Sequence, residues 1–484
     1  MQIAFVASEC VPFVKTGGLA DVVGALSREM AQRGHEVTVY LPLYAAVRPY
    51  LEGEWKYAIS SITIPFQHYS RFAGIVDGGV RDGVKYYFVD CPELFDRKGI
   101  YGPNGSEYGD NAERFGLFAR AVLEASKQLG VPQIFHIHDW QASMIPVFLH
   151  TVYRDDPMLR KAGVVLTIHN AGYQGWFPPT TTEQLLLPWE IFRFDKLEHY
   201  NTFNFLKGGV VYSDMITAVS PGYAEEIQTP DGGNGLDGAL RQRAADLRGI
   251  LNGVDYAEWD PATDGNLAAH FTPQNLKGKR ECRRDLLHAF GIDVPESTPV
   301  VGIVSRFATQ KGFDLLKEAG GQLAERDMAI VALGTGEPLY EHFFRELAYA
   351  NSARVAVQIR YDDAMAHKIE AGSDIFLMPS RFEPCGLNQI YSLKYGTVPV
   401  VRATGGLDDT VEEWNSEHKS GTGFKFRDYS PQALLAAIDR AISVFHDRES
   451  WLQLMQNGMA QNFSWDEPAR QYNAVYEEVA RSKA

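Results

Sequence analysis

The chain has 484 residues, of which 45% are hydrophobic and 22% are charged, and its formal net charge is −15. This length exceeds one ordinary domain, and the composition is that of a globular protein with a sizeable core in each of two large domains. The negative charge argues against nucleic acid or an anionic membrane as a partner, because both require a basic surface. An anionic ligand must therefore be met by local Lys and Arg side chains.

Cysteine usage and hydropathy bear on the cellular compartment. The four cysteines are scattered and form no C-x-x-C pair, which indicates a reducing environment rather than a disulfide framework. No run reaches the roughly 18 apolar residues that a membrane span needs. Met1 leads directly into the apolar run 3–7, without a basic region or a cleavage site. We therefore expect a cytoplasmic protein, or one of the plastid stroma if a transit peptide has been removed.

The first half of the chain alternates between strand and helix patterns. Residues 2–8 predict a buried strand, and apolar residues then recur at helical spacing from Leu19 to Met30 until Gly34 ends the helix. A second strand at 36–41 completes a strand, loop, helix, strand unit, which is typical of a parallel α/β sheet. Further apolar runs continue the sheet at 85–89, 134–138, 164–168 and 215–219.

The pattern changes near Asn252, where turn residues precede a polar stretch rich in Lys and Arg. We interpret this region as the interdomain connection. The alternation then resumes, with strands predicted at 299–305, 328–334, 354–359, 373–378 and 398–401. The predicted fold is therefore α/β, with two doubly wound Rossmann-like domains, 1–254 and 255–463, facing each other across a cleft that binds the ligands.

The loop after the first strand, 15–21, has the sequence Lys-Thr-Gly-Gly-Leu-Ala-Asp and leads into a helix. Its paired glycines let backbone N–H groups approach an anion, and the helix N-terminus and Lys15 add positive charge. A phosphate or sugar contact is therefore predicted, the alternative being an ordinary tight turn with an exposed lysine. The loop is neither a G-x-G-x-x-G fingerprint nor a Walker A motif.

Two later strands of the first half end in polar residues. His136 and His138 alternate along one strand and are expected on opposite faces, which argues against a shared zinc ion. Asp139, just past that strand, is placed to meet a sugar hydroxyl or a developing charge, although it could equally cap a helix. His169 follows the strand 164–168. A lone histidine there is more often structural, but two such strand ends in one domain favour a site.

The loop 305–312 supplies a local basic pair in this acidic chain. Arg306 could bind a diphosphate through paired hydrogen bonds, and Lys311 could act as a point charge. The alternative is a surface ion pair.

The loop 379–389 also joins a strand to a helix. Glu383 offers two acceptors for vicinal sugar hydroxyls, and the N–H groups of 385–387 open the helix. Cys385 is not interpreted as a nucleophile, because no histidine of the motif could act as its base. The turn 404–407 is a further candidate anion loop.

In this order, the motifs at 15–21, 136–140, 251–255, 305–312, 380–387 and 404–407 resemble the bacterial glycogen synthase and plant starch synthase family, nearly from end to end. The resemblance implies a glycosyltransferase B-type fold and transfer of glucose from ADP-glucose to an α-1,4-glucan primer such as glycogen, starch or a maltooligosaccharide. The anomeric configuration would be retained. ADP-glucose is then a substrate, and no cofactor is implied.

The same resemblance implies roles for individual residues. Arg306 and Lys311 would neutralise the departing ADP, Glu383 would hold glucose hydroxyls, and Tyr361 would stack on adenine. The catalytic set would be Lys15, Asp139, His169, Arg306, Lys311 and Glu383. The substrate-binding set would be Gly18, Asp21, Tyr101, Asn252, Tyr361, Cys385, Gly386, Leu387, Thr404 and Gly405. The segment 464–484 resembles a terminal helix that crosses back to the first domain.

Two sequence absences refine these expectations. No two aspartates lie two residues apart, so the D-x-D pair of metal-dependent glycosyltransferases is missing, and Arg306 and Lys311 are expected to replace a metal ion. The residue eight positions after Glu383 is Tyr391, so the second glutamate of the E-x7-E motif of many relatives, often a ribose contact, is absent.

Several alternatives stay open at the level of sequence. Retention could proceed through a covalent intermediate, with Asp139 as the only candidate nucleophile, or through front-face substitution. A related enzyme could use UDP-glucose or a small-sugar acceptor. A catalytically silent glucan-binding protein would have lost the cleft charges, and an NAD-dependent oxidoreductase would need a third glycine after 334–336. The sequence predicts no oligomeric state.

Overall fold

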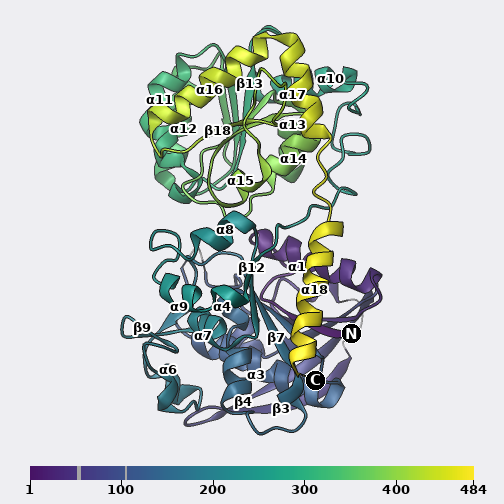
Figure 1. Cartoon of the computed structure of the whole chain (residues 1–484), viewed down its shortest axis with the longest axis vertical. Coiled ribbons are helices and arrows are strands. Elements are labelled where there is room, and N and C mark those ends of the chain that lie inside the picture. Colours follow the sequence, from purple (N-terminus) through teal and green to yellow (C-terminus); the bar gives the residue numbers. More distant parts are fainter. Residues whose placement is uncertain (52–55, 104–105, 484) are drawn as a thin grey trace. The chain divides into compact units, whose positions relative to one another are not determined.

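The computed structural model describes residues 1–51, 56–103 and 106–483 (Figure 1) and divides into two compact units. The N-terminal unit comprises Met1–Val219, Ala224–Gly253 and Trp465–Ala484, and the C-terminal unit comprises Ser220–Tyr223 and Val254–Ser464. The chain therefore passes between the units next to residues 254 and 464 and also on either side of the short segment Ser220–Tyr223. Each unit contains a sheet whose strands are mainly parallel, with helices packed on it.

The described sheet of the N-terminal unit has the order β12-β11-β7-β6-β1-β2-β5-β4-β3. Its parallel strands are β1 (Gln2–Val6), β2 (Glu36–Pro42), β5 (Val84–Asp90), β6 (Ile134–His138), β7 (Gly163–Ile168), β11 (Met215–Ala218) and β12 (Leu247–Gly249). The antiparallel strands β3 (Tyr57–Pro65) and β4 (Ser70–Arg81) extend one edge. The predicted parallel strands are confirmed, whereas the antiparallel pair and β12 were not predicted.

Helices cover both faces of this sheet. The helices of this unit include α1 (Gly18–Gln32), α2 (Pro92–Phe95), α3 (Asn111–Leu129), α4 (Asp139–Ala142), α5 (Met144–His150), α6 (Thr181–Gln184), α7 (Phe205–Tyr212), α9 (Asp237–Gln242) and α18 (Asp466–Lys483). The terminal helix α18 packs against β7 and α1 (Figure 1). Helix α8 (Pro221–Glu226) and a small sheet of β8 (Trp176–Phe177), β10 (Thr202–Asn204) and β9 (Glu198–His199) lie in connecting segments.

The described sheet of the C-terminal unit is entirely parallel, in the order β15-β14-β13-β16-β17-β18. Its strands are β13 (Val300–Val304), β14 (Ala329–Leu333), β15 (Val355–Gln358), β16 (Ile375–Met378), β17 (Val398–Arg402) and β18 (Phe424–Phe426). Its helices are α10 (Lys277–Phe290), α11 (Phe313–Ala324), α12 (Pro338–Ala350), α13 (Asp363–Gly372), α14 (Asn388–Lys394), α15 (Gly405–Thr410), α16 (Pro431–His446) and α17 (Arg448–Met459). Of these strands, only β18 was not predicted.

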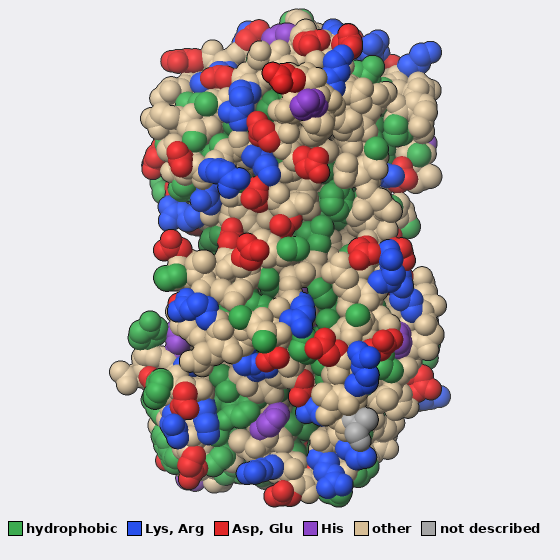
Figure 2. Space-filling model, viewed as in Figure 1, with side chains coloured by type: hydrophobic (Ala, Val, Ile, Leu, Met, Phe, Trp, Pro, Cys, Tyr) green, Lys and Arg blue, Asp and Glu red, His purple; other side chains and the backbone are tan. Residues whose placement is uncertain are grey.

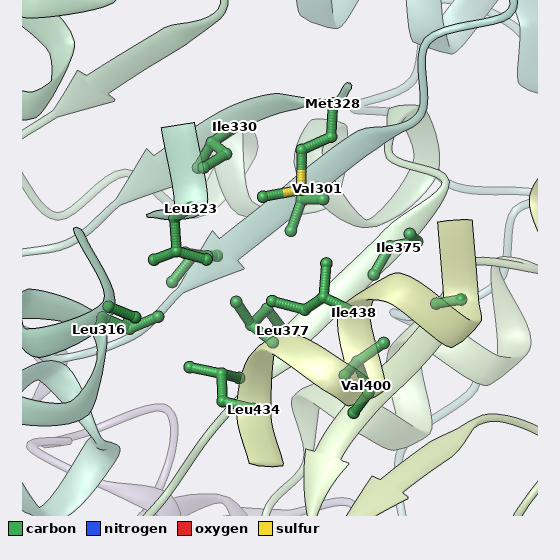
Figure 3. Packing of buried hydrophobic residues seen from close by; sticks show 14 of the residues in the cluster. Val301, Leu316, Leu323, Met328, Ile330, Ile375, Leu377, Val400, Leu434 and Ile438 are labelled. Carbon is green, nitrogen blue, oxygen red and sulfur yellow. The ribbon is translucent and has the colours of Figure 1, made fainter. Parts of the chain in front are cut away.

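The core of the C-terminal unit shows why its sequence alternates between apolar strands and amphipathic helices. In Figure 3, Leu377 and Val400 project from the sheet toward Leu434 and Ile438 of α16, and all four are at most 3% exposed. Burial of such a side chain contributes about 1.5–3 kcal/mol, so a helix that presents an apolar stripe is held on the sheet.

The strand order determines where each unit can bind a ligand. In both sheets the first strand lies in the middle, and the chain then builds outward in the two directions. Loops therefore diverge at the carboxyl ends of β1 and β6 in one unit and of β13 and β16 in the other, which is where doubly wound sheets bind ligands. The charged side chains of the two signs are interspersed on the surface that Figure 2 shows. No helix within the described ranges is long and apolar enough to cross a membrane.

Candidate active site

Three polar side chains follow adjacent parallel strands of the N-terminal unit. Glu9 follows β1, Asp139 follows β6, and His169 follows β7. Strand β6 pairs with β1 on one side and with β7 on the other. The carboxyl ends of the strands therefore bring the predicted Asp139 and His169 together with Glu9, a residue that the sequence pattern did not single out.

Glu9 holds the loop that carries Lys15. Its carboxylate is 3% exposed and accepts hydrogen bonds from the Thr16 hydroxyl at 2.7 Å, from the Thr16 N–H and from the Gly17 N–H at 3.3 Å. The Tyr101 hydroxyl also donates to it. The N–H groups of Thr16 and Gly17 therefore already have an internal acceptor, and the predicted contact of this loop with a phosphate or sugar stays a prediction. Gly18 begins α1, where the first N–H groups have no partner within the helix.

Lys15 and Asp21, which were predicted as separate site residues, form an ion pair. The Lys15 Nζ lies 2.8 Å from the Asp21 Oδ1, and the lysine side chain is 46% exposed. Asp21 lies in the first turn of α1, so the pair closes the loop onto its own helix. A glutamate directly after an apolar strand, in Ser8-Glu9-Cys10, was the signal in the sequence that an acid supports this loop.

Asp139 is buried in a left-handed backbone conformation, with φ of 54°. Its Oδ1 accepts hydrogen bonds from the N–H groups of His169, at 2.7 Å, and Asn170, at 3.4 Å. The side chain therefore binds the end of β7, and no hydrogen bond caps its own helix. Burial raises the pKa of Asp139 to about 7, with a further increase from the charge of Glu9, although the two N–H groups oppose the shift.

His169 is partly exposed and adjoins the buried histidines His136 and His138. Its Nε2 lies 3.0 Å from the Nδ1 of His138, and burial lowers the pKa of His169 to about 3. The expectation that His136 and His138 face opposite sides is wrong: their ring centroids are 4.2 Å apart, because residues two apart on a strand share a face. His136 also contacts the hydroxyls of Thr167, at 2.7 Å, and of Tyr476 in α18, at 2.8 Å. These partners favour a neutral, structural network.

Asn252, the remaining predicted residue of the N-terminal unit, offers a buried acceptor. It is 5% exposed, and its Oδ1 has no hydrogen-bond partner among the described residues. Its N–H donates to the Val219 carbonyl, which places it beyond β11. A buried carbonyl without a partner costs about 1–3 kcal/mol, so a substrate hydroxyl bound there would relieve an existing penalty.

In the C-terminal unit, the loops after β13 and β16 bring Lys311 and Glu383 together. The Lys311 Nζ lies 2.6 Å from the Glu383 Oε2, and the Ser380 hydroxyl donates to the same oxygen at 3.1 Å. The two side chains are 21% and 6% exposed. Lysine and glutamate were predicted to hold different parts of the donor, and the structure shows that they share one site.

Glycines hold these loops in contact. Gly312 has φ of +80°, and a Cβ atom there would lie 2.1 Å from the Pro379 carbonyl oxygen. A Cβ atom at Gly406 would lie 2.1 Å from the Cys385 carbonyl oxygen, and the Gly406 N–H donates to the backbone carbonyl of Glu383. The turn with Thr404 and Gly405 therefore packs directly on the Glu383 loop, whose end, with Gly386 and Leu387, leads into α14.

The other predicted residues of this unit lie nearer its surface. Arg306 is exposed, and its guanidinium donates to Gln310 at 3.2 Å. Tyr361, just beyond β15, is 81% exposed. Tyr391, which stands at the position of the absent second glutamate, stacks on Trp259 with ring centroids 3.9 Å apart. An aromatic contact therefore occupies this position.

Sequence comparisons identify the family. Residues 2–242 match the family model described as the starch synthase catalytic domain, and residues 288–457 match glycosyl transferases group 1. A glycogen synthase of Koribacter versatilis is 55% identical over 100% of this chain and 99% of its own length. The chain belongs to the glycogen synthase and starch synthase family. A glycogen synthase of Anaeromyxobacter dehalogenans is 48% identical over 99% of this chain and 100% of its own length, which supports the same family.

Structural comparison agrees with this membership. The catalytic domain of starch synthase IV from Arabidopsis thaliana, solved with ADP and acarbose bound, superimposes with a TM-score of 0.89, at 31% identity over 99% of both chains. A sucrose-phosphate synthase from Thermosynechococcus elongatus, at 15% identity and a TM-score of 0.61 over 100% of both chains, shares the fold. The glycosyltransferase B-type fold and the family resemblance are thus confirmed. The protein is a glycosyltransferase that transfers glucosyl units to a glucan.

Proposed function

We propose that this glycosyltransferase takes glucose from ADP-glucose, adds it to the non-reducing end of an α-1,4-glucan with retention of configuration, and needs no metal ion or other cofactor. The observation that carries the proposal is the contact of Lys311 with Glu383 at the carboxyl ends of β13 and β16. It combines a cation for a diphosphate with a carboxylate for sugar hydroxyls, at the switch point of a doubly wound sheet. The relative from Arabidopsis thaliana that binds ADP supports an adenine nucleotide.

The charges of the C-terminal unit suit cleavage of the bond between C1 of glucose and the diphosphate oxygen. Negative charge develops on the leaving diphosphate, and a fixed cation there stabilises the transition state more than the ground state. Lys311 is already positioned by Glu383, so it loses little freedom when the donor binds. Arg306, which is exposed and makes one hydrogen bond to a neutral side chain, can turn toward the diphosphate. Glu383 receives glucose hydroxyls on its carboxylate.

The N-terminal unit supplies neutral and weakly ionised groups. His169 is neutral near pH 7, since burial lowers its pKa to about 3, so we assign it hydrogen bonding to the sugar rather than proton donation. Asp139, with a pKa of about 7, is ionised in part of the molecules at that pH and can stabilise positive charge on the sugar ring. Lys15 reaches the donor if it leaves Asp21. Asn252 accepts a hydrogen bond from a glucose hydroxyl. Tyr101 donates a hydrogen bond to Glu9 and so helps to hold the loop that carries Lys15.

A donor comparison tests the proposal. The purified chain is given a maltooligosaccharide primer with either ADP-glucose or UDP-glucose, with and without EDTA. We expect extension from ADP-glucose that EDTA leaves unchanged. Extension from UDP-glucose alone would refute the proposed donor. Loss of extension in EDTA while the chain stays folded, as followed by circular dichroism, would refute a transfer step without a metal ion. A product resistant to enzymes specific for α-1,4 bonds would refute retention.

Variants test which cations act on the diphosphate. Removal of a fixed charge from a transition state costs about 3–4 kcal/mol, so Lys311→Met and Arg306→Ala should each lower kcat about 100-fold or more. Arg345→Ala is the matched control, because Arg345 is an exposed arginine of α12 that pairs with Glu341. Wild-type rates in both test variants would refute their role.

A further inference from the structure

A cluster of metal-ligating side chains lies in the C-terminal unit, apart from Lys311 and Glu383. Within the described residues, one ligand atom each of Glu258, Asp363 and His367 lies within 4.8 Å of the other two. Asp363 and His367 are four residues apart in α13, so they project from the same face of that helix. Glu258 comes from the segment that begins the unit after Val254. The three residues thus join two segments far apart in the sequence.

The imidazole of His367 is oriented as in a metal site. Its side chain is 1% exposed, and its Nδ1 lies 2.7 Å from the Oδ2 of the equally buried Asp264. The Tyr395 hydroxyl donates to the same carboxylate at 2.6 Å. A carboxylate within hydrogen-bond distance of Nδ1 leaves Nε2 as the ring nitrogen that faces away from Asp264, which is the arrangement of metal-binding histidines.

The second ring nitrogen faces the carboxylates of the cluster. The Nε2 of His367 lies 3.9 Å from the Asp363 Oδ2. The indole of Trp259 stacks on the ring, with centroids 3.7 Å apart and planes 11° apart, so the ring cannot turn away easily. The Nε2 of His367 and the two carboxylates therefore offer three ligand atoms to one position, which a cation can occupy.

We propose that Glu258, Asp363 and His367 bind a divalent transition-metal cation, with Zn²⁺ as the expected ion. One imidazole nitrogen and two carboxylate oxygens form a mixed donor set that suits zinc and leaves a fourth position for water. Ligand bonds of about 2.0–2.2 Å require the atoms to approach one another. The exposed side chains of Glu258 and Asp363 can move, whereas His367 is fixed. Two negative charges balance the ion.

The proposed ion has a structural role that differs from catalysis. It connects the segment 254–264 to the first turn of α13, directly after Tyr361. Metal binding therefore stabilises this segment in the folded state, since the ligands are not assembled in the unfolded chain. This proposal does not depend on the donor sugar, because Lys311 and Glu383 take no part in it.

Calorimetric titration of the chelator-treated full-length chain with Zn²⁺ tests the site. We expect one tight site in the wild type and at least about tenfold weaker binding in Glu258→Gln and in Asp363→Asn. Both substitutions affect exposed side chains and keep their shape, so the fold is retained. The control is His342→Ala with Glu346→Gln, an exposed histidine and glutamate pair at the same helical spacing, 3.1 Å apart. This pair lacks a third ligand and a carboxylate that orients the histidine, so replacing both residues should leave Zn²⁺ binding unchanged.

Two further measurements separate the possible outcomes. Co²⁺ should give the visible absorption of a nitrogen-containing site in the wild type and lose it in Asp363→Asn. Hydrogen exchange of residues 255–264 should slow when Zn²⁺ is added. Equal Zn²⁺ binding by the wild type and the Glu258→Gln and Asp363→Asn variants would overturn the proposal, as would loss of binding in the control. Mg²⁺ binding as tight as that of Zn²⁺ would also overturn it, because it would exclude the imidazole as a ligand.

Discussion

The buried carboxyl of Asp139 should make the N-terminal unit less stable as the pH rises. Its pKa is about 7 in the folded protein, against 3.8 for an ordinary aspartate. Between these values the unfolded chain has released the proton and the folded chain has kept it, so folding loses stability with increasing pH. The penalty grows by about 1.4 kcal/mol per pH unit and levels off near 4 kcal/mol above pH 7.

Asp139→Asn removes this penalty and keeps the local geometry. The amide oxygen can still accept from the His169 N–H, and Asn tolerates the left-handed conformation of this position. Relative to the wild type, the variant should gain about 2 kcal/mol between pH 5.5 and pH 8. Hydrogen exchange of the β6 and β7 amides at the two pH values measures this gain without assuming that the two units unfold together.

Asp82→Asn is the matched control, because Asp82 has the same left-handed backbone, with φ of 50°, and an exposed side chain. The stability difference between Asp82→Asn and the wild type, measured by the same exchange, should not change with pH, because both proteins keep Asp139. A stability difference between Asp139→Asn and the wild type that stays constant with pH would show that burial does not govern this carboxyl. An equal shift in the control would point to a general effect of pH. The transfer rate of the wild type should also rise as Asp139 ionises near pH 7, and that of the variant should not.

Three further changes test buried contacts. Glu9→Gln should destabilise the protein by about 1–3 kcal/mol, because the loop N–H donors would face a neutral amide in place of a carboxylate. Thermal unfolding measures the loss of stability, and hydrogen exchange of residues 15–18 should become faster. Unchanged exchange of these residues would contradict the role of Glu9. Burial lowers the pKa of Lys279 to about 8 from 10.5, so between these values the folded chain has lost a proton that the unfolded chain keeps. Wild-type stability relative to Lys279→Met should therefore rise with pH, by about 1.4 kcal/mol per unit, and a flat difference in urea unfolding would argue against it. Gly312→Ala should abolish transfer and destabilise by more than about 2 kcal/mol, since its Cβ meets the Pro379 carbonyl. Gly291→Ala, at φ of +66° with no atom within 4 Å, should cost only the conformational strain.

Local periodicity by itself determined most of the sheet architecture. Parallel strands buried on both faces need continuous apolar runs, and the runs at 134–138 and 164–168 correspond closely to β6 and β7. The polar residues that follow such runs lie where the strands end, so Asp139 and Lys311 could be chosen as candidates from sequence. The edge pair β3 and β4 was missed because a half-exposed antiparallel pair has a weaker pattern.

Only the tertiary structure decided how the candidate residues pair. Lys311 and Glu383 are 72 positions apart in the chain, and Glu9 and Tyr101 are 92 apart, so no local pattern relates them. No local pattern predicts the burial that shifts the pKa of Asp139 either. Nor does one predict the contact between Asp264 and His367, which are 103 residues apart. Strand and helix preferences act within a few residues and can be recognised in the sequence. Charge pairing and desolvation depend on which loops meet, and that is settled only when the strands assemble in their sheet order.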